Sequence, residues 1–142
     1  MSGPPRPSSR PVAAIVLAVA AFVAVAILML MPMGPRSFGS SVAYLDKLVH
    51  AGAWATLAVC LWPLVRHLWR RPIMTRFGVI VAGLGLWGLA TEWLQSYVPS
   101  RSSDLLDALA DLVGAVVGAT LASLFLEPRL ARRTPPPAEN PP

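Results

Sequence analysis

The amino-acid sequence gathers acidic side chains and their potential partners at three points in an otherwise apolar chain. Carboxylates can bind cations or move protons, and an imidazole can act as an acid or base near neutral pH. Ammonium and guanidinium groups can hold phosphates or carboxylates. The residues with these capabilities, together with one amide, are Asp46, Lys47, His50, Glu92, Gln95, Arg101, Asp104, Asp107 and Asp111. They would suit a polar pocket if the fold brought them together.

The chain has four apolar runs of 18 to 22 residues, and the last three contain or adjoin these polar residues. At a rise of about 1.5 Å per residue, a helix of this length spans the roughly 30 Å hydrocarbon core of a membrane. A soluble bundle would show polar faces at helical spacing, and the first run has none. The sequence therefore predicts an all-α polytopic membrane protein, a bundle of four transmembrane helices. The four runs are Val12 to Met31, Leu48 to Val65, Phe77 to Val98, and Leu105 to Leu126.

Proline marks both ends of the predicted membrane domain. Residues 1–11 and residues 127–142 are too polar and proline-rich to bury a core, so we expect two disordered tails around a domain at 12–126. Pro128 is expected to end the fourth helix. The first apolar run exceeds the roughly 7–15 residues of a signal-peptide core, and it is expected to be retained.

The distribution of basic residues predicts the orientation in the membrane. Nine of the 12 arginines and lysines lie in the two tails and in the loop between the second and third runs. Short cytoplasmic loops are enriched in these residues, so both termini should be cytoplasmic in the plasma membrane and the polar residues should face outward. Trp62 and Trp69 fit an aromatic belt at the cytoplasmic boundary. The pI near 10.7 then reflects contact with anionic lipid, and no folded basic domain supports nucleic-acid binding.

Helical periodicity directs the polar residues toward one another. Asp104, Asp107, Asp111, Gly114 and Gly118 share one face of the fourth helix, and the two glycines form a G-x-x-x-G step that allows close helix approach. The third helix carries a similar stripe, made by Gly85, Gly88, Glu92 and Gln95. The first helix has no such stripe and is expected at the periphery of the bundle.

Two segments resemble the VanZ-like family of bacterial membrane proteins. "DKLVH", residues 46–50, is similar to the family pattern D-K-x-x-H. "EWLQSYVPSRSSDLLDALADLVGAVVG", residues 92–118, is similar to E-x-x-Q-x-x-x-P-x-R-x-x-D-x-x-D-x-x-x-N-x-x-G-x-x-x-G. Trp54 and Asp111 depart from the tyrosine and asparagine that the family often carries. The resemblance covers about half of the chain, and it implies an envelope membrane protein with a link to resistance against the glycopeptide teicoplanin.

These residues define a candidate site with assigned roles. The candidates for catalysis are His50, Glu92 and Asp107, and those for ligand binding are Asp46, Lys47, Gln95, Arg101, Asp104 and Asp111. The expected partners are membrane lipid and a lipid-linked cell-wall precursor or glycopeptide. No organic cofactor is expected. Three aspartates on one face can hold Mg²⁺ or Ca²⁺, but their spacing is not diagnostic of a metal site.

Three functional interpretations remain open at this point. The pocket can bind, and also act on, a polar headgroup or lipid-linked precursor. It can belong to a small ion- or proton-coupled transporter, since intramembrane acids mark such pathways, although four helices are few and the cytoplasmic half shows no acids to continue a path. Alternatively, the charges pair only to fix the helices, in a non-catalytic interaction protein.

Overall fold

The computed structural model describes residues 9–31, 41–99 and 103–132, which form helices joined by short connections. The helices are α1 (Ser9–Leu30), α2 (Ser41–Leu68), α3 (Ile73–Gln95), α4 (Leu105–Leu121), the π-helical segment η1 (Ala122–Leu126) and α5 (Glu127–Arg132). By length and composition, four helical spans can cross a membrane, the last running from Leu105 through η1 and α5 to Arg132. The prediction of an all-α bundle with four transmembrane helices is therefore confirmed.

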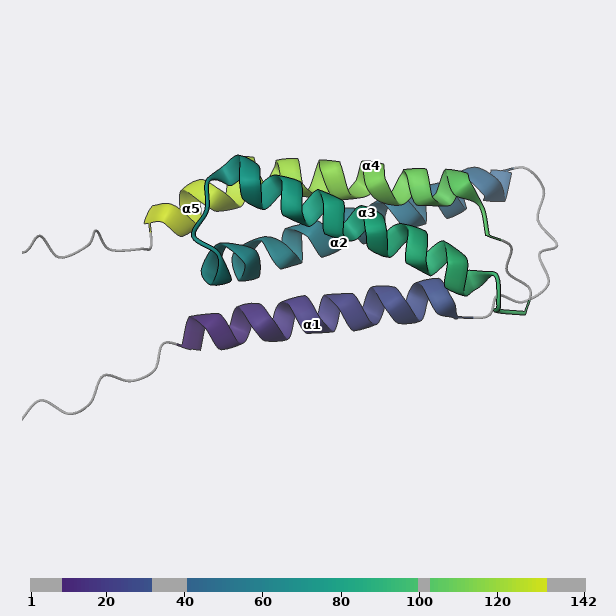
Figure 1. The fold of residues 1–142 in the computed structure, drawn as a ribbon, viewed down its shortest axis with the longest axis horizontal. Coiled ribbons are helices and arrows are strands. Elements are labelled where there is room, and N and C mark those ends of the chain that lie inside the picture. Colours follow the sequence, from purple (N-terminus) through teal and green to yellow (C-terminus); the bar gives the residue numbers. More distant parts are fainter. Residues whose placement is uncertain (1–8, 32–40, 100–102, 133–142) are drawn as a thin grey trace, which may run out of the picture.

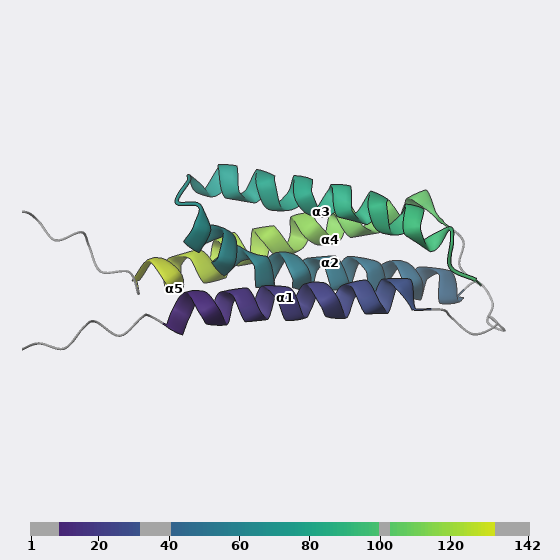
Figure 2. The same ribbon diagram turned by 60° about the horizontal axis from the view of Figure 1, so that its bottom comes forward.

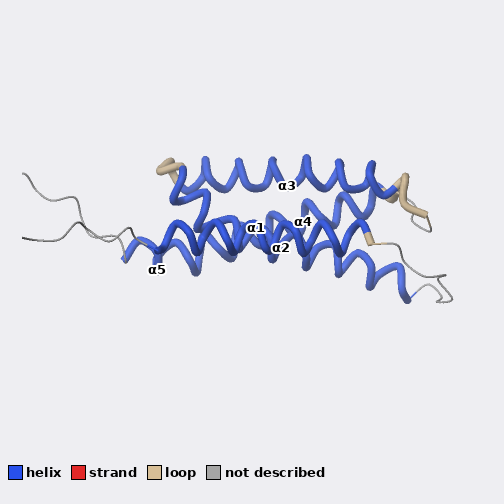
Figure 3. Tube along the Cα trace, turned by 90° about the horizontal axis from the view of Figure 1, so that it is seen from below, coloured by secondary structure: helices blue, strands red, loops and turns tan. Residues whose placement is uncertain are grey.

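The helices pack as a layer of three with the remaining helix on one side. Helix α2 lies between α1 and α4 in this layer, and α3 packs against α2 and α4 (Figures 1, 2 and 3). Helix α2 makes its most extensive contacts with α4. Helix α1 is at the edge of the layer, as predicted from its lack of a polar or small-residue stripe, and most of its side chains are exposed to the surroundings of the bundle.

The close contact between α2 and α4 depends on two glycines. A Cβ atom at Gly114 would overlap the carbonyl oxygen of Ala51, and one at Gly118 would overlap that of Ala55. The obstructing atoms belong to the backbone of α2, so no side-chain rotation could relieve the overlap. The G-x-x-x-G step therefore sets the separation of these two helices, and with it the separation of the polar groups that they carry.

Apolar side chains fill the middle of the bundle. Trp54, Leu57, Ala58 and Leu84 are fully or almost fully buried, and the indole Nε1 of Trp54 donates to the backbone carbonyl of Leu84 at 3.0 Å. Large apolar side chains on all four spans face outward. A water-soluble protein rarely exposes so much contiguous apolar surface, whereas hydrocarbon surroundings favour it.

The fourth span continues beyond its predicted end at Leu126. The wide π turn of η1 precedes Pro128, and α5 then carries the helix to Arg132. Proline at this position was expected to stop the helix because it has no N–H to donate. Residues 127–132 therefore extend the bundle, rather than starting the tail predicted at 127–142. Similarly, α1 begins at Ser9, before the predicted boundary at residue 12.

Candidate functional site

The polar residues selected from the sequence meet at one end of the bundle. The first turns of α2 and α4 and the last turns of α3 lie at this end, opposite the start of α1 and the end of α5 (Figures 1 and 2). Arg101 lies outside the described residues. The other eight residues are called the polar cluster below: Asp46, Lys47 and His50 on α2, Glu92 and Gln95 on α3, and Asp104, Asp107 and Asp111 at the start of α4.

Lys47 joins the second turn of α2 to the start of α4. Its Nζ lies 2.9 Å from Asp104 Oδ2 and 2.8 Å from Asp107 Oδ1. Asp104 caps α4, because its other carboxylate oxygen accepts the N–H of Leu106 at 2.9 Å. The Lys47 ammonium and this N–H hold the pKa of Asp104 below its usual range. The charge of Lys47 is therefore already balanced by two carboxylates, which makes it a poorer anchor for a phosphate than the sequence suggested.

His50 and Asp111 form the most deeply buried polar pair of the cluster. His50 Nδ1 lies 2.9 Å from Asp111 Oδ1, and the two side chains are 1% and 0% exposed. Gly88 on α3 makes room for this pair, since a Cβ atom there would lie 3.0 Å from Asp111 Oδ2. A buried carboxylate on Nδ1 fixes the orientation of the imidazole ring and leaves Nε2 to act on another group.

Glu92 and Gln95 connect α3 to its neighbours at the same end. Glu92 Oε2 accepts the backbone N–H of Asp104 at 2.7 Å, which ties α3 to the N-cap residue of α4. Gln95 Nε2 donates to the carbonyl of Met29 on α1 at 2.9 Å. Glu92 is 6% exposed and Gln95 1% exposed, so both polar groups are removed from solvent. Gln95 therefore acts as a link between helices, while Glu92 keeps one carboxylate oxygen for other partners.

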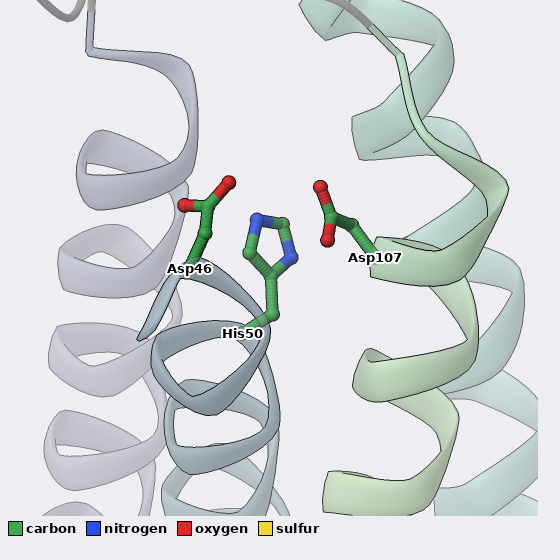
Figure 4. Close-up of side chains that lie close together, drawn as sticks. All are labelled: Asp46, His50 and Asp107. Atoms are coloured by element: carbon green, nitrogen blue, oxygen red, sulfur yellow. The ribbon is translucent and has the colours of Figure 1, made fainter. Parts of the chain in front are cut away.

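The cluster contains two overlapping sets of potential metal-ligating atoms centred on His50. One set is Asp46, His50 and Asp107, and the other is His50, Glu92 and Asp111; within each set the ligand atoms lie within 4.8 Å of one another. The imidazole of His50 lies between the carboxylates of Asp46 and Asp107 (Figure 4). Three buried atoms of the cluster make no hydrogen bond to any residue that the structure describes: His50 Nε2, Glu92 Oε1 and Asp111 Oδ2.

The arrangement has an excess of acceptors. The eight residues include five carboxyl groups but only one ammonium group. Ionised carboxylates in a site of low polarity require protons, cations or hydrogen-bond donors close by. The cluster is therefore suited to bind a cation or a ligand rich in hydroxyl and amine groups. The buried His50–Asp111 pair can also hold or pass on a proton at Nε2.

A second buried polar group at the opposite end of the bundle was not predicted. The carboxylate of Glu127 receives two 2.9 Å hydrogen bonds from the guanidinium of Arg76. It also accepts from Arg66 Nε at 3.2 Å and from Trp62 Nε1 at 3.0 Å. Trp62 is 1% exposed and lies under the Arg76 guanidinium, so its predicted place in a lipid-facing aromatic belt is wrong. The sequence signal for this group was Glu127, a single acid after the fourth run. It lies on the same predicted side of the membrane as the four arginines between the second and third runs.

Comparison with known proteins gives no relative: no protein-family model, no curated protein and no solved structure matches the chain.

Proposed function

We propose that this chain is a VanZ-like membrane protein of the bacterial envelope that binds one amphiphilic lipid. The polar cluster would receive the headgroup, and an apolar groove between α3 and α4 would receive one hydrocarbon chain. The observation that carries this proposal is that the groove ends beside the cluster. The groove has a volume of about 770 Å³ and is lined by Phe77, Gly78, Val81, Ala82, Gly85, Leu86 and Leu89 of α3 and by Leu105, Leu106, Ala108, Leu109 and Leu112 of α4.

The dimensions of the groove fit a chain from one leaflet. On α3 it extends from Phe77 to Leu89, which is about 18 Å at the helical rise of about 1.5 Å per residue. One leaflet contributes about half of the roughly 30 Å hydrocarbon core. Its volume lies within the range of about 300–1,000 Å³ that is typical of small-molecule pockets. Lipid is the molecule that is always available to an apolar groove on a transmembrane surface.

The groove and the cluster meet at the start of α4. Leu105 and Leu106, at one end of the groove, stand between Asp104 and Asp107 in the sequence. The hydrogen bond from Asp104 N–H to Glu92 Oε2 crosses from α4 to α3 at the same level. A lipid chain in the groove would therefore bring its headgroup to these carboxylates. Their excess of acceptors favours a headgroup with hydroxyl and amine donors, such as the sugar and peptide part of a lipid-linked cell-wall precursor.

The interior of the bundle gives little support to a transporter. Between the polar cluster and the Glu127 group, the buried side chains of the described residues are apolar, including Trp54, Leu57, Ile80 and Ala115. An ion or proton pathway requires polar groups or water along its length. At the other end, the Glu127 carboxylate already accepts four hydrogen bonds, two of them from Arg76. Binding from one side of the membrane is the better account of the geometry.

The lipid-binding proposal predicts a specific loss on filling the groove. Ala82 is exposed and lines the groove, so Ala82→Phe would occupy the space for a hydrocarbon chain. Val79 is exposed on the same helix but outside the groove, so Val79→Phe is the matched control. Native mass spectrometry of gently extracted protein should show a retained lipid in the wild type and in Val79→Phe. The lipid-bound fraction of Ala82→Phe should fall at least about tenfold, equivalent to about 1.4 kcal/mol. Equal retention by the two variants would contradict the groove as the binding site.

The proposed orientation has both termini in the cytoplasm and the polar cluster outside, following the distribution of basic residues. Ser103 and Thr75 are exposed at opposite ends of the bundle. In a Cys60→Ser background, Ser103→Cys should react with a membrane-impermeant thiol reagent in intact cells, and Thr75→Cys should react only after the membrane is opened. The reverse pattern would place the cluster on the cytoplasmic side and exclude contact with an extracellular glycopeptide.

A further inference from the structure

We propose that the polar cluster holds one divalent cation of the Mn²⁺–Zn²⁺ class, between Asp46 and His50 of α2 and Asp107 of α4. The inference concerns the same cluster as the proposed lipid headgroup site, but it does not require that a lipid binds. Three observations support it: the burial of His50, the contact of its Nδ1 with Asp111, and the carboxylates of Asp46 and Asp107 on either side of its ring.

His50 presents a nitrogen that the protein does not use. Its Nε2 is buried and makes no hydrogen bond within the described residues, although the side chain is only 1% exposed. A buried nitrogen without a partner is costly, because it loses its contacts with water and gains none in return. The imidazole stands between the carboxylates of Asp46 and Asp107 (Figure 4), and atoms of these three residues lie within 4.8 Å of one another. This separation allows one ion to contact all three.

The other ring nitrogen has the environment of a metal-ligating histidine. In metal sites, the imidazole nitrogen that does not ligate almost always donates to a carboxylate, a carbonyl or water, which fixes the ring and strengthens the ligating nitrogen. Asp111 Oδ1 occupies this position, 2.9 Å from His50 Nδ1. Asp111 is 0% exposed, and Gly88 leaves space for it. Asp111 is thus a positioning residue, which acts on the ion through His50.

The remaining charges favour a cation at this place. Lys47 faces the site and holds Asp107 by Oδ1, which leaves the second carboxylate oxygen of Asp107 for the ion. Lys47 also balances Asp104. The carboxylates of Glu92 and Asp111 also lie close to His50, and a divalent ion would offset part of this negative charge. One imidazole with carboxylate oxygens is a ligand set for Zn²⁺ or Mn²⁺, whereas Ca²⁺ prefers oxygen ligands alone.

The test measures binding of Zn²⁺ and Mn²⁺ to purified protein in detergent by titration calorimetry, with Ca²⁺ for comparison. The wild type should bind one Zn²⁺ per chain and should prefer it to Ca²⁺. His50→Gln should lower the affinity at least about 100-fold, and Asp111→Asn should lower it about 10- to 100-fold. His67→Gln is the matched control for His50→Gln, because it makes the same change at the other histidine of the sequence, which is exposed in the last turn of α2. Its affinity should stay within about threefold of the wild type.

Circular dichroism and gel filtration establish whether each variant is folded. If a variant does not fold, X-ray absorption of the Zn²⁺-loaded wild type identifies the ligands of the ion. We expect one imidazole, with oxygen atoms as the other ligands. No saturable binding to the wild type, equal affinities of His50→Gln and wild type, or a spectrum without imidazole would overturn the inference. Ala82→Phe separates this result from the lipid proposal, since that variant should lose lipid but retain the ion.

Discussion

Gly114→Ala should destabilise the bundle by about 3 kcal/mol, at the upper end of the usual range for overpacked cores. The added methyl group would overlap the carbonyl oxygen of Ala51 and would lie 2.8 Å from its Cα. Both atoms belong to the backbone of α2, so the helices must separate to admit it. Separation would also lengthen the contacts of Lys47 and His50 with α4, because both pairs bridge the same two helices. The free energy of unfolding in mixed micelles measures this effect.

Gly83→Ala provides the control for this substitution. Gly83 lies in the middle of α3, and a Cβ atom there would meet nothing within 4 Å. Its substitution should not lower the free energy of unfolding, and the higher helix propensity of alanine should raise it by about 0.5–1 kcal/mol. If Gly114→Ala were as harmless as Gly83→Ala, the close approach of α2 and α4 would not be what positions the polar cluster.

Glu127→Gln should cost about 3 kcal/mol of stability, because it leaves the buried guanidinium of Arg76 without its anionic partner. The side chains of Arg76 and Glu127 are only 7% and 13% exposed, and their contact is bidentate. Glutamine preserves the size of the side chain, but it can accept only through one oxygen. The midpoint of thermal unfolding in detergent measures the loss.

A double substitution distinguishes the ion pair from a general packing effect. Glu127→Gln combined with Arg76→Met removes both charges and keeps an apolar side chain of similar length. The double variant should recover most of the lost stability, since replacing a buried ion pair by apolar groups is often neutral or stabilising. A double variant less stable than Glu127→Gln alone would show that Arg76 contributes through its contacts with Arg71 or Trp62 instead.

The sequence was sufficient to predict which residues meet at the polar end of the bundle. Helices that alternate in direction must bring the start of α2, the end of α3 and the start of α4 to one side, whatever their side-chain contacts. Helical spacing also identified the faces, and Gly114 and Gly118 indicated a close helix contact. These inferences depend only on chain direction and periodicity, which four apolar spans determine.

The pairing within the cluster could not be predicted in the same way. Lys47 has several carboxylates within reach of its flexible side chain, and its choice of Asp104 and Asp107 depends on the rotation of α2 relative to α4. The contact of His50 with Asp111, and that of Glu92 with a backbone N–H, would be lost or formed on changes of a few tenths of an ångström in the distance between the helices. Such distances result from packing of the whole bundle.

The Glu127 group was missed for a different reason. Pro128 normally indicates the end of a helix, so Glu127 was assigned to a tail. The π turn of η1 widens the helix immediately before the proline and allows the chain to continue. This turn brings Glu127 to Trp62 and Arg76.

The groove was likewise not predicted, although Gly78, Ala82 and Gly85 form a row of small residues along α3 that leaves space for it.

Site-specific photo-crosslinking in native membranes tests the central claim, a lipid chain in the groove with its headgroup at the polar cluster. A photoreactive residue is placed at Ala82, inside the groove, and in a second protein at Val79, outside it. Mass spectrometry then identifies the captured lipids. We expect the Ala82 probe to capture one headgroup class far above its abundance in the membrane, and Glu92→Gln with Asp107→Asn to abolish this selectivity. Capture of the same bulk lipid mixture at Ala82 and Val79 would contradict the claim.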